Sequence, residues 1–287
     1  MKIPPFDYHI PHSTNEAVAM LDSLGEDAKL IAGGQSLIPM LALRMSRFSD
    51  LIDLGSVGSL RGVSIETGRV TVGAMTTQSA VERDPAIRAA LPLLSNAVGL
   101  IGHFQIRSRG TIGGSLAHAE PAAELPAVAC AVGAEFCIVG PTGERRVAAA
   151  DFFQSTWTTA LDHADVLTAV EFPIWGSGSA ITEIARRHGD FAIAGACCCV
   201  DVRDEKVSAA SVYLFGVSST PWRCREAEVA MTGCPVADLD LTELGRAAVV
   251  ELEPFADLHA SSGYRSRAAA ALVERAIGDA IKGADVE

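Results

Sequence analysis

The sequence has too few basic residues to suit a polyanion. Its 287 residues carry 23 Lys and Arg against 35 Asp and Glu, which gives a formal net charge of −12 at pH 7. Because the phosphates of DNA or RNA would repel such a chain, the composition argues against a nucleic-acid partner. No apolar run approaches the roughly 18 residues that span a bilayer, and residues 1–5 lack the apolar core of a signal peptide. We therefore expect a cytoplasmic protein without a transmembrane segment.

Metal-binding cysteine motifs are also missing. None of the seven cysteines forms a Cys-x-x-Cys pair. Three of them, Cys197, Cys198 and Cys199, are consecutive within the apolar run 191–202, which is typical of a buried strand. Adjacent strand residues face opposite sides, so these thiols cannot converge on one ion. The pattern predicts free thiols packed as small core residues in a reducing compartment, and no metal site.

Catalytic signatures are absent as well. The chain has no Gly-x-Ser-x-Gly elbow, no His-Glu-x-x-His pair and no lysine after a glycine loop. Its seven histidines are dispersed without ligand spacing. His118 follows a glycine-rich stretch and is the histidine best placed to approach a ligand, although a solvated or core-packed imidazole is the simpler interpretation. We predict no catalytic nucleophile and no acid–base set.

What the sequence does contain is two stretches of small residues around paired glycines. Residues 31–37 are Ile-Ala-Gly-Gly-Gln-Ser-Leu, and residues 110–116 are Gly-Thr-Ile-Gly-Gly-Ser-Leu. Glycine tolerates positive φ and has no Cβ, so such a turn can aim consecutive backbone N–H groups at one anion, with Ser or Thr hydroxyls beside them. Two such turns predict a pyrophosphate held from two sides. Two ordinary glycine turns remain the alternative.

Charged and aromatic residues after the second stretch, and at the start of the last expected domain, suggest further contacts with a ligand. Glu120 and Glu124 follow the second stretch, where a carboxylate would repel phosphate but accept a hydrogen bond from a ribose hydroxyl. The spacing does not decide between the two, and both also suit a helix start. Residues 186–191, Arg-Arg-His-Gly-Asp-Phe, form either a solvated turn or an aromatic facing a planar cofactor. A cation there would stabilise a reduced, anionic flavin.

The hydrophobic periodicity predicts a small β-α-β unit in the first fifty-odd residues. Ser13 and Glu16 form a capping box for a helix that ends at Gly25. Residues 28–32 and 50–54 are short buried strands. The first glycine stretch follows the first of these strands and precedes an apolar helical segment, a context in which a helix N-terminus can face a phosphate.

Later segments predict two more units. In the middle of the chain we expect hairpins at 62–75 and 134–147, helices at 78–100 (with breaks at Pro85 and Pro92) and 122–132, and a strand at 166–172. Beyond a small-residue link at 175–179, we expect an antiparallel sheet of strands 181–187, 192–202 and 206–217, followed by helices 223–231, 241–252 and 264–281. This order indicates an α+β class. We expect three domains: 1–55, 56–176 and 177–287.

Together these motifs resemble the FAD-binding medium subunits of the molybdenum hydroxylase (xanthine oxidase) family, in particular those of aerobic carbon monoxide dehydrogenase and of quinoline and nicotine dehydrogenases. The likeness covers almost the whole chain and is carried by residues 6–8, 32–37, 73–77, 105–107, 111–115, 187–191 and 259–265. It implies an FAD-binding fold of the PCMH type. Two small α/β subdomains would enclose FAD, and a C-terminal domain of the CO dehydrogenase flavoprotein type would add a three-stranded antiparallel sheet with helices.

The resemblance also assigns residues to the cofactor. Residues 32–36 and 111–115 would hold the FAD pyrophosphate, Ile101 would line the flavin, and Glu124 would touch the adenosine half. Phe191 would lie near the isoalloxazine ring, with Arg187 as a basic neighbour. The complete set of predicted cofactor-binding residues is Ala32, Gly33, Gly34, Gln35, Ser36, Leu37, Ile101, Thr111, Ile112, Gly113, Gly114, Ser115, His118, Glu124, Arg187, Asp190 and Phe191.

The same resemblance implies an oxidoreductase subunit within a larger complex. A large partner subunit would carry molybdopterin, and a small one two [2Fe–2S] clusters that pass electrons to FAD and on to an external acceptor. The assembly would be a dimer of heterotrimers. Residues 115–119 replace the Asn-containing run of CO-oxidising subunits, which favours an N-heterocycle or other aromatic substrate over carbon monoxide. A self-contained FAD oxidase of the same fold is the alternative, and a binding module with purely structural glycine turns is a third.

Overall fold

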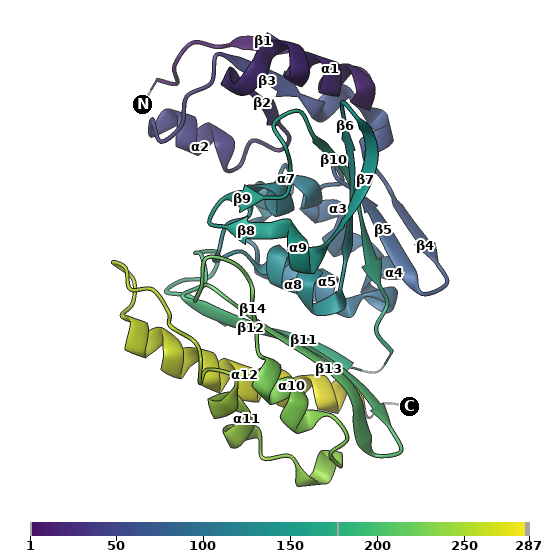
Figure 1. Ribbon diagram of the computed structural model, residues 1–287, viewed down its shortest axis with the longest axis vertical. Coiled ribbons are helices and arrows are strands. Elements are labelled where there is room, and N and C mark those ends of the chain that lie inside the picture. The colour runs from purple at the N-terminus through teal and green to yellow at the C-terminus, as the bar shows by residue number, and fades with distance from the viewer. Residues whose placement is uncertain (1, 177, 285–287) are drawn as a thin grey trace.

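The computed structural model describes residues 2–176 and 178–284. They form three units along the long axis of the molecule, with the N-terminal unit at the top of Figure 1, a middle unit, and the C-terminal unit at the bottom. The mixture of helices and mostly antiparallel sheets confirms the predicted α+β class. The three domain boundaries expected from the sequence stay predictions, and Ser177 of the expected link lies outside the described residues.

The N-terminal unit is a parallel sheet in the order β1-β3-β2, formed by β1 (Asp7–His9), β2 (Ala28–Ile31) and β3 (Asp50–Asp53). Helix α1 (Thr14–Leu24) begins where predicted, because the Ser13 hydroxyl accepts a 3.2 Å hydrogen bond from the Glu16 N–H. Helix α2 (Leu37–Ala42) follows the first glycine stretch. The sequence did not predict β1, whose three residues are mostly exposed and give no periodic signal.

The core of the N-terminal unit is completed by the middle unit. Buried side chains of α1 and the parallel sheet pack with Met75, Ala164 and Val166 in one cluster. Val166 is the first residue of β10 (Val166–Pro173), the central strand of the middle sheet. The two units are therefore joined by a shared hydrophobic core.

The middle unit is built on a five-stranded antiparallel sheet in the order β4-β5-β10-β6-β7. The predicted hairpins supply β4 (Val63–Glu66), β5 (Arg69–Gly73), β6 (Glu135–Gly140) and β7 (Gly143–Ala148). A two-stranded hairpin of β8 (Phe153–Ser155) and β9 (Thr158–Thr159) lies beside it and was not predicted.

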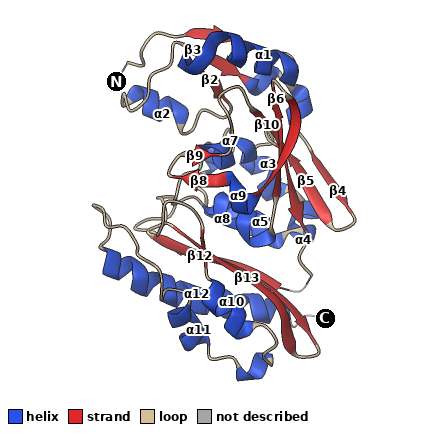
Figure 2. Ribbon diagram, in the orientation of Figure 1, coloured by secondary structure: helices blue, strands red, loops and turns tan. Residues whose placement is uncertain are grey.

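Most helices of the middle unit lie on one side of this sheet (Figure 2). Pro85 and Pro92 each begin a helix, since proline suits the first helical position, and the chain breaks where predicted. The helices are α3 (Gln78–Arg83), α4 (Pro85–Ala90), α5 (Pro92–Leu100), α6 (Phe104–Arg107), α7 (Ile112–His118), α8 (Glu124–Val132) and α9 (Ala149–Phe152).

The C-terminal unit is an antiparallel sheet backed by three helices, α10 (Arg225–Met231), α11 (Leu241–Ala247) and α12 (Ser262–Ala284). The sheet has four strands, not the three expected: β11 (Gly178–Ile184), β12 (Ala194–Arg203), β13 (Lys206–Phe215) and β14 (Trp222–Arg223). The fourth strand has only two residues, too few for a visible period. The cysteine triplet lies fully buried in β12 as free thiols, as predicted, with Cys197 and Cys199 facing the middle unit and Cys198 facing the helices.

A buried arginine ties the C-terminal unit to the junction with the middle unit. Arg265 of α12 donates hydrogen bonds to the backbone carbonyls of Ile193 and Gly216 and to the Asp257 carboxylate. The Gly216 N–H in turn donates to the carbonyl of Pro121, at 2.8 Å. This chain of contacts fixes the start of β12 and the end of β13 against the segment between α7 and α8.

Candidate functional site

The first glycine stretch forms a row of free backbone donors between β2 and α2. Gly34 has φ +71°, a conformation that favours glycine, and its carbonyl accepts the Ile38 N–H at 3.1 Å. The Ser36 side chain accepts no bond from α2. Within the described part of the chain, no hydrogen-bond acceptor is found for the backbone N–H groups of residues 33–37. Five successive free donors beside a serine hydroxyl are well suited to an anion.

The second glycine stretch differs from the expectation. We predicted a tight turn with glycine at positive φ, but Gly113 and Gly114 lie in the first turn of α7 and have no positive φ. The Thr111 hydroxyl caps this helix by accepting the Gly114 N–H at 3.0 Å. Ile112 and Gly113 donate their N–H groups to the carbonyls of the β5–α3 connection. Most backbone donors of this stretch are therefore already used, the Thr111 N–H excepted, and its hydroxyl groups are the main donors that it can offer a ligand.

Close packing explains the glycines of α7. A Cβ built on Gly113 would lie 2.4 Å from the Ala74 Cβ, closer than real side chains approach. Glycine is therefore required at this position because it has no side chain, and not because of a positive φ. A sequence pattern alone does not separate these two reasons for glycine.

The two stretches lie directly against each other, although they belong to different units. A Cβ on Gly33 would lie 2.1 Å from the Arg109 carbonyl oxygen and 2.9 Å from the Gly110 Cα. A Cβ on Gly114 would lie 3.4 Å from the Cβ of Ala32. The open donors of the first stretch thus face a seam whose other wall is the start of α7.

At the end of α7, an aromatic pair distinguishes the surroundings of Glu120 from those of Glu124. The Trp157 indole stacks on His118 with ring centroids 6.3 Å apart, and its Nε1–H donates to Glu120 at 2.7 Å. Glu120 is therefore engaged by the β8–β9 hairpin. Burial lowers the pKa of His118, so its imidazole is neutral at pH 7. Trp157 was missed by the sequence analysis, because a lone aromatic in a polar loop gives no local signal.

Glu124, unlike Glu120, is buried. It is the first residue of α8, two residues later than the predicted helix start, and is only 7% exposed. Burial raises the pKa of its carboxyl group to about 8, so the group is mostly protonated at neutral pH. A protonated carboxyl can both donate a hydrogen bond and accept one, which suits a hydroxyl-bearing ligand.

Ile101 is held in place by an arginine that the sequence did not single out as functional. Arg107 donates to the carbonyls of Ile101 and Gly102 at 2.9 and 3.1 Å, and its Nε and Nη2 groups hold Glu82 at 2.9 Å each. Its side chain is only 11% exposed. The segment predicted to line the flavin is thus fixed to α3 by a bidentate ion pair.

Residues 187–191 lie in the turn after β11, against the segment that follows Ile101. A Cβ on Gly189 would lie 2.7 Å from the His103 ring, and the His103 and His188 rings are 5.9 Å apart. Arg187, expected as a basic neighbour of the ring, pairs with Asp190 at 3.2 Å. Phe191 is 67% exposed, an unusual position for a large aromatic and one that a planar ligand would cover.

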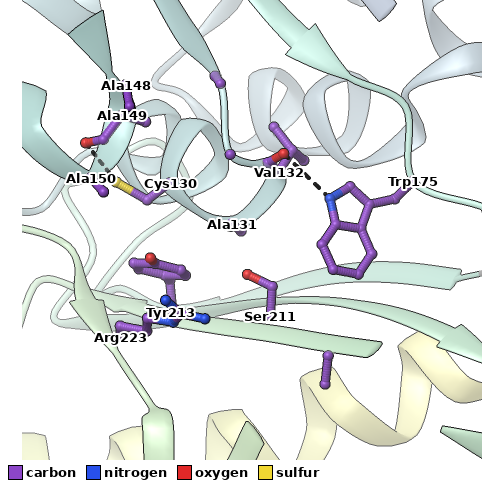
Figure 3. Close-up of a pocket in the computed structure, with 13 residues that line it drawn as sticks. Cys130, Ala131, Val132, Ala148, Ala149, Ala150, Trp175, Ser211, Tyr213 and Arg223 are labelled. Atoms are coloured by element: carbon purple, nitrogen blue, oxygen red, sulfur yellow. Dashed lines mark hydrogen bonds between the residues drawn. The ribbon is translucent and has the colours of Figure 1, made fainter. Parts of the chain in front are cut away.

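A cavity of about 280 Å³ lies elsewhere, between α8 and β13 (Figure 3). Tyr213, Ser211 and Arg223 line it together with Trp175, whose indole N–H donates to the Val132 carbonyl at 3.3 Å. None of the predicted cofactor residues lines it. Across residues 2–176 and 178–284 there is no metal-ligating cluster of three or more His, Cys, Asp or Glu, and no helix long and apolar enough to cross a membrane.

The chain matches two family models that divide it almost completely. Residues 4–175 match the FAD-binding domain in molybdopterin dehydrogenase, and residues 179–280 match the CO dehydrogenase flavoprotein C-terminal domain.

Curated relatives match over nearly the full length. The chain is 39% identical to the 6-hydroxypseudooxynicotine dehydrogenase complex subunit alpha of Paenarthrobacter nicotinovorans, over 98% of this chain and 96% of that one. It is 38% identical to the carbon monoxide dehydrogenase medium chain of Hydrogenophaga pseudoflava, over 96% and 97%.

Solved structures agree with these sequence matches. Carbon monoxide dehydrogenase from Hydrogenophaga pseudoflava superposes with a TM-score of 0.96 at 38% identity, covering 99% of this chain and 100% of that one. Quinoline 2-oxidoreductase from Pseudomonas putida 86 gives 0.95 at 35% identity, covering 99% of each. The chain belongs to the FAD-binding medium subunits of the molybdenum hydroxylases, which are subunits of oxidoreductase complexes.

Proposed function

We propose that the chain is the electron-transfer subunit of a molybdenum hydroxylase, in which FAD receives electrons from [2Fe–2S] clusters on a small partner subunit and passes them to an external acceptor. Substrate oxidation would take place at molybdopterin on a large partner subunit, and two such heterotrimers would form the complex. The relatives support this, because their names describe them as subunits or medium chains of dehydrogenases or of a hydroxylase.

The row of unpaired N–H groups at residues 33–37 carries the proposal. A pyrophosphate has the negative charge and the acceptor oxygens that such donors require. The hydroxyls of Ser36 and Ser115 lie on the two facing stretches, and Ala32 and Gly114 leave room for close approach. In this arrangement the first stretch supplies backbone donors, while the second supplies a hydroxyl and a wall without bulk.

The other predicted residues would either orient the flavin ring or set the electrostatic potential around it. Ile101 and Phe191 would contact the faces or edge of the ring, because Arg107 and the 187–191 turn hold their segments together. Arg187 would act as part of a neutralised pair with Asp190, which gives the ring a weaker positive field than a free cation would.

The proposed substrate is an N-heterocyclic or other aromatic compound, or carbon monoxide. Relatives between 33% and 39% identical are named for 6-hydroxypseudooxynicotine, carbon monoxide, caffeine and nicotine. Since these substrates share no single chemistry, the substrate is expected to be chosen by the large partner subunit.

Purification from the native host under anaerobic conditions tests the proposal. We expect one FAD per chain, together with a large chain that carries molybdenum and a small chain that carries iron and acid-labile sulfide. Adding nicotine-type heterocycles or carbon monoxide to that complex should bleach the flavin absorbance with one of them. A chain that purifies alone with FAD and oxidises a substrate unaided would instead support the self-contained oxidase.

A further inference from the structure

A second carboxyl group near the junction of the middle and C-terminal units belongs to Glu183 of β11, a half-buried residue whose negative charge is among the causes that raise the pKa of Glu124. Side chains alternate along β11: Ile181 packs against the core of the middle unit, whereas Ile184 packs against the C-terminal core. The Thr182 hydroxyl donates to the Leu272 carbonyl of α12 at 3.2 Å, which places it on the helix side. Glu183 therefore shares the face of Ile181 and points toward the middle unit.

Glu183 lacks a hydrogen-bond donor. Its Oε2 atom is buried and has no hydrogen-bond partner among the described residues, and no ion pair found there includes Glu183 or Glu124. Burial raises the pKa of Glu183 to about 7, and the negative charge of Glu183 adds to the burial that raises the pKa of Glu124. A buried acceptor without a donor is costly and rare, so it calls for an explanation.

The chemistry of the Glu124 and Glu183 carboxyl groups indicates which ligand group would donate the missing hydrogen bonds. Two carboxyl groups without a nearby cation offer a phosphate no positive charge, but they accept hydrogen bonds from hydroxyls whether or not they are ionised. The matching ligand is a polyol segment. FAD contains two, the ribityl chain and the adenosine ribose, one on each side of its pyrophosphate.

We propose that Glu183 is a further FAD-binding residue, whose carboxyl group, together with that of Glu124, accepts hydrogen bonds from a polyol segment of the cofactor across the junction between the middle and C-terminal units. This inference rests on the proposed function. It gives the C-terminal unit a direct part in binding FAD through the strand β11, in addition to the 187–191 turn.

The test is FAD titration of the deflavinated full chain, followed by flavin fluorescence, for wild type, Glu183→Leu and Glu183→Gln. Leucine removes the unpaired buried oxygen, so the thermal midpoint of the FAD-free chain should stay equal or rise. The Kd for FAD should rise about tenfold, because the ligand hydroxyl loses its acceptor. Glutamine keeps one acceptor oxygen and should weaken binding less, and it carries the test if the leucine variant does not fold.

The matched control is Thr182→Val, the neighbouring position on the opposite face of β11, which should leave the Kd for FAD unchanged. FMN has only the ribityl chain, and ADP has only the ribose. Titrating the variants with each of them identifies the polyol segment, because only the ligand that carries it should bind more weakly. An unchanged Kd in both Glu183 variants overturns the inference. A wild-type chain that does not bind FAD at all would instead refute the proposed function.

Discussion

Replacing Gly33 by alanine tests whether the contact between the two glycine stretches builds the cofactor site. The new Cβ would lie 2.1 Å from the Arg109 carbonyl oxygen, more than an ångström short of the 3.4 Å at which ordinary contact begins. Because the atoms that it meets are backbone, no side-chain rotation relieves the overlap, and the two stretches must move apart. Overpacking of this kind costs about 1–3 kcal/mol, and rigid neighbours place this site near the upper end.

The expected results are a thermal midpoint lower by about 5–10 °C and a Kd for FAD about thirtyfold higher, which corresponds to about 2 kcal/mol of binding free energy. Differential scanning fluorimetry and flavin fluorescence titration measure the two quantities. Gly58→Ala is the matched control, since a Cβ there meets no atom within 4 Å, and it should change neither. Wild-type affinity for FAD in Gly33→Ala would refute the idea that this seam shapes the site.

Three further variants probe the surroundings of the site. Arg107→Ala should lower the free energy of unfolding by about 2 kcal/mol in urea titrations and weaken FAD binding, because Glu82 loses its partner and the loop after α5 is released; wild-type stability would argue against the clamp. Although burial opposes it, hydrogen bonds from backbone N–H groups and Arg265 hold the pKa of Asp257 at about 2, below its unfolded value of about 3.9. Its contribution to stability is therefore present above pH 4 and lost as the pH falls through 2, so Asp257→Asn should be less stable than wild type at pH 6, and most of that difference should be gone at pH 2 by urea titration. Phe191→Ala should keep FAD and the wild-type thermal midpoint, since the side chain is 67% exposed, but shift the flavin absorbance or potential; unchanged spectra would place Phe191 away from the ring.

Most of the fold could be predicted because its signals are local. The Ser13 cap, the prolines at 85 and 92 and the alternation of the two middle hairpins each fix an element within a few residues. Among the missed strands, β1 and β14 have three and two residues, and they form only because a neighbouring strand offers hydrogen bonds. Pairing with a distant strand leaves no trace in so short a segment.

The sequence could name candidate residues for the site, but it could not predict how they are arranged. The glycine pairs stood out, yet the sequence could not show that Gly113 serves close packing while Gly34 serves a positive φ. Glu120 and Glu124 were indistinguishable until Trp157, 37 residues beyond Glu120, was found to hold the first of them. Such choices depend on long-range contacts, which periodicity does not encode.

The hydrophobic core that the N-terminal and middle units share limits where the chain can be truncated. Since Met75, Ala164 and Val166 supply part of the apolar packing beneath α1, the first fifty-odd residues would expose that face if the chain were cut behind β3. The segment that carries the open row of N–H donors is thus not a portable anion-binding module. Its geometry exists only while a strand more than a hundred residues later in the chain lies beneath it.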